Sequence, residues 1–108
     1  MAGRVPIEHY QSASGRVPFE ERFQSLDGRH REAVDRRINT LQENDHFGDC
    51  RSLKHGLFEM RLLGPGLRIY FARMDYLIVL LGGSEKKSQQ RAIRVARIRL
   101  KELKARMS

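Results

Sequence analysis

Hydrophobic residues recur in the first part of the chain with the spacing of two amphipathic helices. The first apolar stripe comprises Phe19, Phe23 and Leu26. The second comprises Val34, Ile38 and Leu41. Pro18 suits the first turn of the earlier helix, and Asp27 is a plausible N-cap for the later one, which we expect to end near Asn44. The pattern predicts an N-terminal helical hairpin, preceded by a short strand within residues 5–11.

After residue 56 the period of the pattern changes to two, which is typical of strands. Apolar residues occupy alternate positions on both sides of the turn sequence GPG (64–66). Residues 76–81 (YLIVLL) form an unbroken apolar run, as in a strand that is covered on both faces. We expect the glycine pair that follows this run to end the strand.

The GPG turn allows two registers for the hairpin around it. A two-residue loop sets Arg61 opposite Tyr70, and a four-residue loop sets Arg61 opposite Arg68. In both registers these three side chains lie on the face of the sheet that does not carry the core. We expect the next strand connection to be a two-residue turn at Met74 and Asp75.

Residues 84–108 predict a basic amphipathic helix, with Ser84 or Ser88 as its cap. Its apolar stripe comprises Ile93, Ala96, Leu100, Leu103 and Met107. The segment holds nine Lys or Arg against two acidic residues, a net charge of +7 out of +8 for the whole chain. Such a segment favours a polyanionic partner, with nucleic acid ahead of an acidic membrane surface or an acidic protein. The alternative is a solvated helix face that keeps the protein in solution.

Length and composition limit the class of protein. A chain of 108 residues, 40% hydrophobic and 31% charged, is expected to form one globular domain spanning residues 1–108. No apolar run is long enough to span a membrane, and the N-terminus lacks the apolar stretch of a signal peptide. The single cysteine, Cys50, excludes an internal disulfide framework. We therefore expect a cytoplasmic location.

Metal and cofactor motifs are weak in this sequence. Asp45, His46, Asp49 and Cys50 lie close together, but their spacing fits no known metal site and a polar loop is the simpler interpretation. The sequence has no HExxH motif, no CxxC pair and no glycine-rich phosphate loop. We expect no metal and no small-molecule cofactor.

Cationic residues are expected to gather on the non-core face of the sheet. The group comprises Lys54, Arg61, Arg68, Lys86 and Lys87, with Tyr70 among them. Like charges repel one another, so folding alone does not favour this arrangement. Guanidinium groups bind phosphate through paired hydrogen bonds, and an aromatic ring beside them can stack on a base. The pattern indicates a site that normally holds an anion.

Three stretches of the chain resemble one known superfamily. LKHGLFEMR (53–61), GPGLRIYFAR (64–73) and IVLLGGSEKKSQQRAI (78–93) are similar to the RelE/ParE toxins, most of all to the HigB-like, phage-related branch called addiction module killer proteins. The resemblance covers nearly the whole chain. It implies an α+β fold, a small twisted and mostly antiparallel sheet packed with an N-terminal helical hairpin and a C-terminal helix.

The resemblance also implies a function. RelE-like members are toxins of type II toxin–antitoxin systems and act as mRNA interferases, endoribonucleases that cut mRNA at the ribosomal A site. A cognate helix-turn-helix antitoxin neutralises the toxin in this branch. The expected partners are therefore that antitoxin, mRNA and the ribosome, with no membrane. ParE-like members poison DNA gyrase instead, which leaves a non-catalytic toxin or a nucleic-acid- or antitoxin-binding module as the alternative.

The match can be followed at individual positions. Arg68 corresponds to the family's strand arginine after the turn, and Arg61 to its basic residue late in the preceding strand. Glu59 stands where RelE has a lysine. After the last strand, Lys86 and Lys87 stand where RelE has an arginine, and no tyrosine follows. The missing tyrosine leaves the general acid unassigned.

RNA can be cut without a metal because its own 2′-hydroxyl is the nucleophile, so cations and an acid–base pair suffice. The candidate catalytic residues are Arg61, Arg68, Glu59, His55 and Lys87. The candidate RNA-binding residues are Lys54, Tyr70, Lys86 and Arg91. Glu59 or His55 is the candidate base. The alternatives are that Glu59 is a structural partner of Arg61, that His55 is a loop residue, and that Tyr70 completes the core.

Overall fold

A computed structural model of the chain describes residues 4–44, 50–62 and 66–108. The elements in chain order are β1 (Ile7–His9), α1 (Pro18–Gln24), α2 (Gly28–Asn44), β2 (Cys50–Ser52), β3 (Leu57–Arg61), β4 (Leu67–Met74), β5 (Leu77–Glu85), the 3₁₀ turn η1 (Lys86–Ser88) and α3 (Gln89–Met107). The strands form one sheet in the order β1-β5-β4-β3-β2. Only the β1–β5 pair is parallel, so the fold is α+β with a mostly antiparallel sheet, as predicted.

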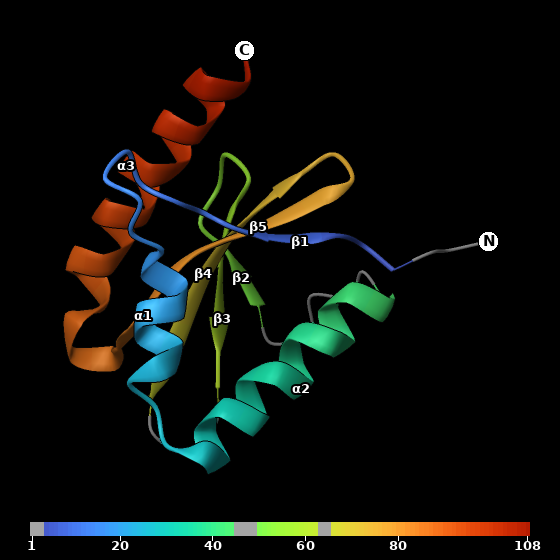
Figure 1. The fold of residues 1–108 in the computed structure, drawn as a ribbon, viewed down its shortest axis with the longest axis vertical. Helices are drawn as coiled ribbons and strands as arrows, with labels where there is room; N and C mark the ends of the chain where they lie inside the picture. Colours follow the sequence, from blue (N-terminus) through green and yellow to red (C-terminus); the bar gives the residue numbers. More distant parts are fainter. Residues whose placement is uncertain (1–3, 45–49, 63–65) are drawn as a thin grey trace.

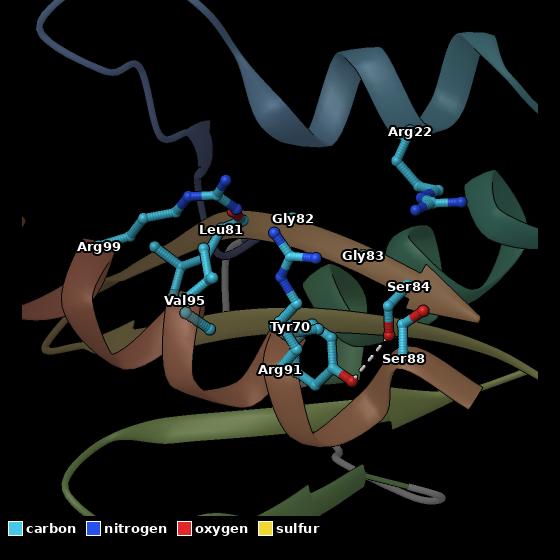
Figure 2. A pocket seen from close by; sticks show the side chains of 12 residues that line it. Arg22, Tyr70, Leu81, Gly82, Gly83, Ser84, Ser88, Arg91, Val95 and Arg99 are labelled. Atoms are coloured by element: carbon cyan, nitrogen blue, oxygen red, sulfur yellow. Dashed lines mark hydrogen bonds between the residues drawn. The ribbon is translucent and has the colours of Figure 1, made fainter. Parts of the chain in front are cut away.

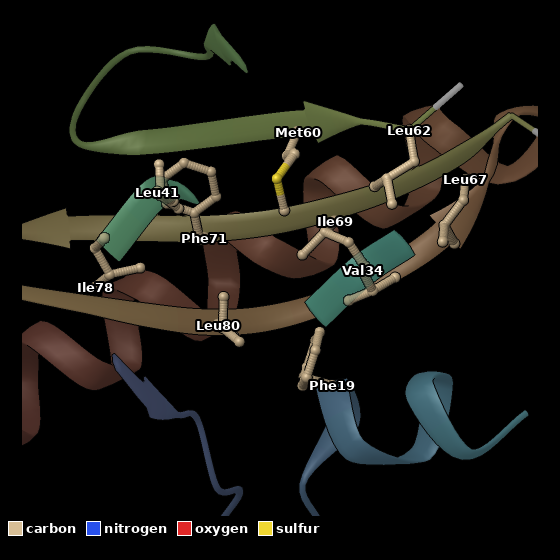
Figure 3. Close-up of a cluster of buried hydrophobic side chains, with 10 residues drawn as sticks. All are labelled: Phe19, Val34, Leu41, Met60, Leu62, Leu67, Ile69, Phe71, Ile78 and Leu80. Carbon is tan, nitrogen blue, oxygen red and sulfur yellow. The ribbon is translucent and has the colours of Figure 1, made fainter. Parts of the chain in front are cut away.

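The helical hairpin lies on one face of the sheet (Figure 1). Both helices begin where the sequence predicts. Pro18 is the first residue of α1, and Asp27 caps α2 because its Oδ1 accepts a 2.9 Å hydrogen bond from the His30 amide. The core between these helices and the sheet is entirely apolar (Figure 3). Its buried members are Phe19, Val34, Leu41, Met60, Leu62, Leu67, Ile69, Phe71, Ile78 and Leu80.

The opposite face of the sheet is covered by α3 (Figure 1). The expectation of an open non-core face is therefore wrong. A 19-residue helix with an apolar stripe needs a surface that covers that stripe. In α3 the stripe residues Ala96 and Leu100 are buried against the sheet. The second core comprises Tyr10, Leu57, Tyr70, Ala72, Val79, Leu81, Ala96 and Leu100. The strand over residues 76–81 is thus covered on both sides, as its unbroken apolar run predicts.

The register of the β3–β4 hairpin follows the four-residue alternative. Arg61 pairs with Arg68, and the Leu62 amide donates to the Leu67 carbonyl at 3.0 Å. The β4–β5 turn lies one residue later than expected, because Met74 pairs with Leu77. Asp75 then occupies the turn with a φ of 48°, a conformation that aspartate tolerates better than most residues.

Strand β5 does not end at the glycine pair. The register shifts between Tyr70 and Phe71, so that Tyr70 faces Gly82 while Phe71 faces Leu80. This irregularity places Leu81 as the extra residue, and the strand continues through both glycines to Glu85. The expectation that Gly82 and Gly83 terminate the strand is wrong because both glycines pair with β4, Gly82 with Tyr70 and Gly83 with Ile69.

Two other sequence expectations fall at the edge of the described residues. Asp45, His46 and Asp49 lie outside them, while Cys50 begins β2. Over residues 4–44, 50–62 and 66–108, no group of three or more His, Cys, Asp or Glu is placed to hold a metal ion. In the same ranges, none of the helices has both the length and the apolar character to cross a membrane.

Candidate functional site

The candidate site centres on Arg68 in the middle of the sheet. Arg68 lies opposite Arg61 on β3 and opposite Ser84 on β5, so the three side chains share one face. Arg68 is 6% exposed and Ser84 is 2% exposed, whereas Arg61 is open to solvent. Of the two registers that the sequence allowed, the structure has the one that pairs Arg61 with Arg68, and Arg68 is buried.

Within residues 4–44, 50–62 and 66–108, no partner balances the charge of the Arg68 guanidinium. Its Nε is buried without a hydrogen bond. Within the described residues, neither a hydrogen bond nor an ion pair joins its guanidinium to a carboxylate or a carbonyl. An uncompensated buried charge is costly, so such a group is expected to meet an anion from outside the chain.

Glu59 is fully buried under the start of α3. Its Oε2 accepts a 2.6 Å hydrogen bond from Gln89 Nε2, and its Oε1 lies 3.4 Å from Arg51 Nη2. The sequence suggested Arg61 as the structural partner of this carboxylate, but the structure gives that place to Gln89 and Arg51. Oε1 itself accepts no hydrogen bond within the described residues. The carboxylate thus lies on the site's face of the sheet, but it is covered.

Tyr70 belongs to the second core, which is the alternative that the sequence left open. Its ring is 1% exposed, so no face of the ring is free to stack on a base. The hydroxyl forms a 3.0 Å hydrogen bond with Ser84 Oγ, in which either hydroxyl can be the donor (Figure 2). Burial raises the pKa of the Tyr70 phenol, and the negative charge of Glu59 raises that pKa further. The phenol therefore stays protonated at neutral pH.

The basic residues after β5 lie at the same end of the sheet as Arg68. Lys86 is exposed and lies beside Gly66, since a Cβ added to Gly66 would lie 3.3 Å from the Lys86 Cβ. Lys87 Nζ lies 3.5 Å from Glu85 Oε2 on the surface. Arg91, in the first turn of α3, lines a pocket beside Ser84 (Figure 2). These three predicted residues therefore border the Arg68 face.

Lys54 and His55 lie elsewhere. Both residues occupy the β2–β3 turn with positive φ angles of 73° and 58°, followed by Gly56. The strand that separates this turn from Arg61 is about 13 Å long, at roughly 3.3 Å for each residue step. The His55 carbonyl accepts a 3.2 Å hydrogen bond from Lys104 near the end of α3. The structure thus does not bring this pair together with Arg68.

Two further arginines approach the site, and the sequence reasoning missed both. Arg22 comes from α1 and Arg99 from α3, and both line the pocket that Arg91 borders (Figure 2). They are 77 residues apart in the chain, so no local spacing could have linked them. The one available signal was the Gly82-Gly83 pair. An added Cβ would lie 2.6 Å from Arg99 Nη1 at Gly82 and 3.0 Å from Arg22 Cγ at Gly83.

The fold is that of the RelE-like toxins. The chain is similar to the solved structure of a mutant of the E. coli toxin RelE in the free state, with a TM-score of 0.61. The similarity covers 81% of this chain and 88% of that one, at 9% sequence identity. The identity is low, so the comparison defines the class of fold.

The family is defined by a closer relative. An uncharacterized protein of Haemophilus influenzae (strain ATCC 51907 / DSM 11121 / KW20 / Rd) is 36% identical over 72 residues, which cover 65% of this chain and 72% of the relative. The chain belongs to the same protein family as that relative. No protein-family model matches the sequence.

Proposed function

We propose that this protein is the toxin of a type II toxin–antitoxin pair and a metal-independent endoribonuclease that cuts mRNA on the ribosome. The observation that carries the proposal is Arg68, a buried guanidinium without a partner in the described residues, beside Arg61 and near Lys86. A scissile phosphate would supply the missing negative charge. The RelE-like fold supports the toxin class, and the stretches quoted above support its HigB-like branch.

The proposed reaction is attack by the RNA 2′-hydroxyl on the adjacent phosphorus, with its proton passing to solvent. The bond from phosphorus to the 5′-oxygen breaks, the 5′-oxygen takes up a proton, and a 2′,3′-cyclic phosphate forms. Negative charge grows on the phosphoryl oxygens in the transition state. Arg68 is fixed by burial, so it would bind this charge without reorganising, and Arg61 would bind a second oxygen from the open side. Cationic positioning of this kind contributes about 10²–10³ in rate.

Proton transfer is assigned less directly. Glu59 and Tyr70 lie under α3, so we assign them to holding the site's shape: the carboxylate fixes Gln89, and the phenol fixes Ser84. The exposed amines of Lys86 and Lys87 are the candidates for charge and proton supply at the leaving oxygen. His55 stays a prediction of the sequence, and its place at the far turn favours the lysines over it.

The proposed partners follow from the class. A helix-turn-helix antitoxin would neutralise the protein, and mRNA in the ribosome would be its substrate, with no cofactor. The alternative, a gyrase poison of the same fold, is favoured by one feature, which is that no tyrosine follows Tyr76. Cut mRNA would indicate the ribonuclease, and intact mRNA would indicate the gyrase poison.

The test is a map of mRNA 5′ ends after a short induced pulse of the wild-type protein, beside Arg68→Ala. We expect new cuts within coding regions in wild type only, with toxicity lost and antitoxin binding retained in the variant. Arg36→Ala is the matched control, because it removes an exposed arginine of α2. Growth arrest with intact mRNA would contradict the ribonuclease proposal and favour the gyrase alternative.

A further inference from the structure

A basic pocket lies at the free edge of β5. Strand β1 pairs with β5 only through Ile7–His9, opposite Ile78–Leu80. Beyond Leu80 this edge has no neighbouring strand in the described chain, and α1 and α3 flank it instead (Figure 2). The resulting cavity of about 250 Å³ is lined by both helices and by the strand edge.

Three arginines converge on this pocket, which we call the β5-edge pocket: Arg22, Arg91 and Arg99. Of the described residues that line it, none is acidic. Arg99 Nη1 donates a 2.8 Å hydrogen bond to the Leu81 carbonyl, and burial lowers the pKa of Arg99. Glu21, beside Arg22 in α1, is bound by Arg16 at 2.7 Å. The positive charge of the pocket is therefore not balanced from within its own lining.

The glycine pair admits two of these arginines to the strand edge. A Cβ on Gly82 would lie 2.6 Å from Arg99 Nη1, and a Cβ on Gly83 would lie 3.0 Å from Arg22 Cγ. The contact at Gly82 would push away the flexible end of Arg99. The contact with Arg22 at Gly83 would be tight, and the Arg68 carbonyl oxygen lies nearer still, at 2.8 Å. The absence of side chains at Gly82 and Gly83, directly after the bulge at Leu81, thus leaves room for Arg99 and Arg22 beside the pocket.

Hydroxyl groups complete the lining. Ser84, Ser88 and Tyr70 line the same cavity as the arginines. Ser88 is the N-cap residue of α3, yet its side chain makes no capping hydrogen bond. Ser84 is the cross-strand neighbour of Arg68, so the β5-edge pocket adjoins the proposed cleavage site. Guanidinium and hydroxyl donors in one small cavity are the chemistry that recognises phosphate.

We infer that the β5-edge pocket is a second phosphate-binding site. The inference that its phosphate belongs to the RNA strand held at Arg68 rests on the proposed function. A strand passing Ser84 would place a neighbouring backbone phosphate among Arg22, Arg91 and Arg99. Free phosphate or the phosphate of a nucleotide shares this chemistry, and the experiment separates the two sources.

The first arm measures inorganic phosphate binding by ¹H–¹⁵N NMR in full-length protein carrying Arg68→Ala, so that the neighbouring site is removed. We expect saturable shifts of the Gly82, Gly83 and Ser84 amides. Adding Arg22→Gln should abolish them, because Gln keeps the Cγ that packs on Gly83 and removes the charged guanidinium. Arg36→Gln, which removes the same charge from α2, should leave them unchanged. No saturable shift, or an equal shift with Arg22→Gln, would overturn the inference.

The second arm measures binding of a short fluorescent single-stranded RNA by anisotropy at several salt concentrations, in the same Arg68→Ala background. Arg22→Gln should weaken binding about tenfold. The slope of log K against log salt is negative, and its magnitude should fall by about 0.7. If Arg22→Gln leaves RNA affinity unchanged but still abolishes the phosphate shifts, the pocket is a phosphate site whose ligand is a free anion. If the phosphate shifts are seen but the wild-type protein cuts no RNA, the β5-edge pocket still binds phosphate and only the proposed function is refuted.

Discussion

The two faces of the sheet differ in the kinds of side chain that they bury. The face under α1 and α2 buries only apolar side chains, among them Phe71, Ile69 and Leu80. The face under α3 also buries apolar residues, but at one end it encloses Glu59 and Arg68.

Burying polar groups costs free energy unless they are paired, and Arg68 Nε and Glu59 Oε1 have no hydrogen-bond partner in the described residues. The α1/α2 face therefore accounts for stability alone. The α3 face combines stability with groups that folding does not favour, which is the mark of a functional site.

The largest expected effect breaks the apolar face. Phe71 is fully buried and stacks on Phe58 at 5.4 Å between ring centroids. Phe71→Ala should lower the free energy of unfolding by about 3–5 kcal/mol, measured by urea denaturation. Tyr76→Ala is the control, since that ring is 86% exposed and its loss should change little. A loss below about 1 kcal/mol for Phe71→Ala would show that this face is not the stabilising one.

A smaller effect is expected on β5 at Gly83, which follows the bulge and pairs with Ile69. A Cβ on Gly83 would lie 2.8 Å from the Arg68 carbonyl oxygen, which is backbone and cannot easily move. Gly83→Ala should cost about 1–3 kcal/mol of unfolding free energy, measured by urea denaturation. Gly28→Ala is the matched control, because nothing lies within 4 Å of its added Cβ. Equal stability of the two variants would argue against a tightly packed edge at β5.

Arg68 itself should cost stability rather than supply it. Arg68→Met keeps much of the buried length and removes the unpaired charge, so we expect the free energy of unfolding to stay equal or to rise by about 1 kcal/mol. Thermal and urea denaturation measure this change, and toxicity should be lost in the same variant. A drop of more than about 1 kcal/mol would mean that the guanidinium is structural, and the contrast between the two faces would weaken.

The smallest effect concerns the end of α3. Arg106 bonds to Glu102 and lowers the pKa of that carboxyl, and the Tyr10 hydroxyl lowers it further. The lowered pKa means that this group stabilises the fold above its unfolded pKa of about 4.3, and that the stabilisation disappears as pH falls through the folded value. Glu102→Gln should therefore flatten the acid limb of stability against pH. An unchanged limb would show that the contact contributes nothing.

Local features of the fold were predictable from the sequence. Pro18 and Asp27 mark helix starts because caps and proline act on neighbouring backbone. The β5 bulge was not predictable, since it depends on how Leu81 packs under α3. A C-terminal helix packed with the sheet was implied by the resemblance and is confirmed. Its apolar stripe alone does not say that it covers the face that carries Arg61 and Arg68.

The site divides along the same line. Alternation along β3 and β4 predicted that Arg61 and Arg68 share a face, because strand geometry is regular. His55 was grouped with them through nearness in sequence, yet an extended strand carries it away. Arg22 and Arg99 join the site only through tertiary packing, which leaves no periodic signal in the chain.

The most direct test of the central claim is single-turnover cleavage of mRNA on programmed ribosomes, comparing the wild type with Arg68→Ala and Arg68→Lys. The account predicts products ending in a 2′,3′-cyclic phosphate, no cut where the 2′-hydroxyl is replaced by hydrogen, and a rate at least about 10²-fold lower for Arg68→Ala, with partial recovery for Arg68→Lys. A wild-type rate in Arg68→Ala, or products with a free 3′-hydroxyl, would contradict it.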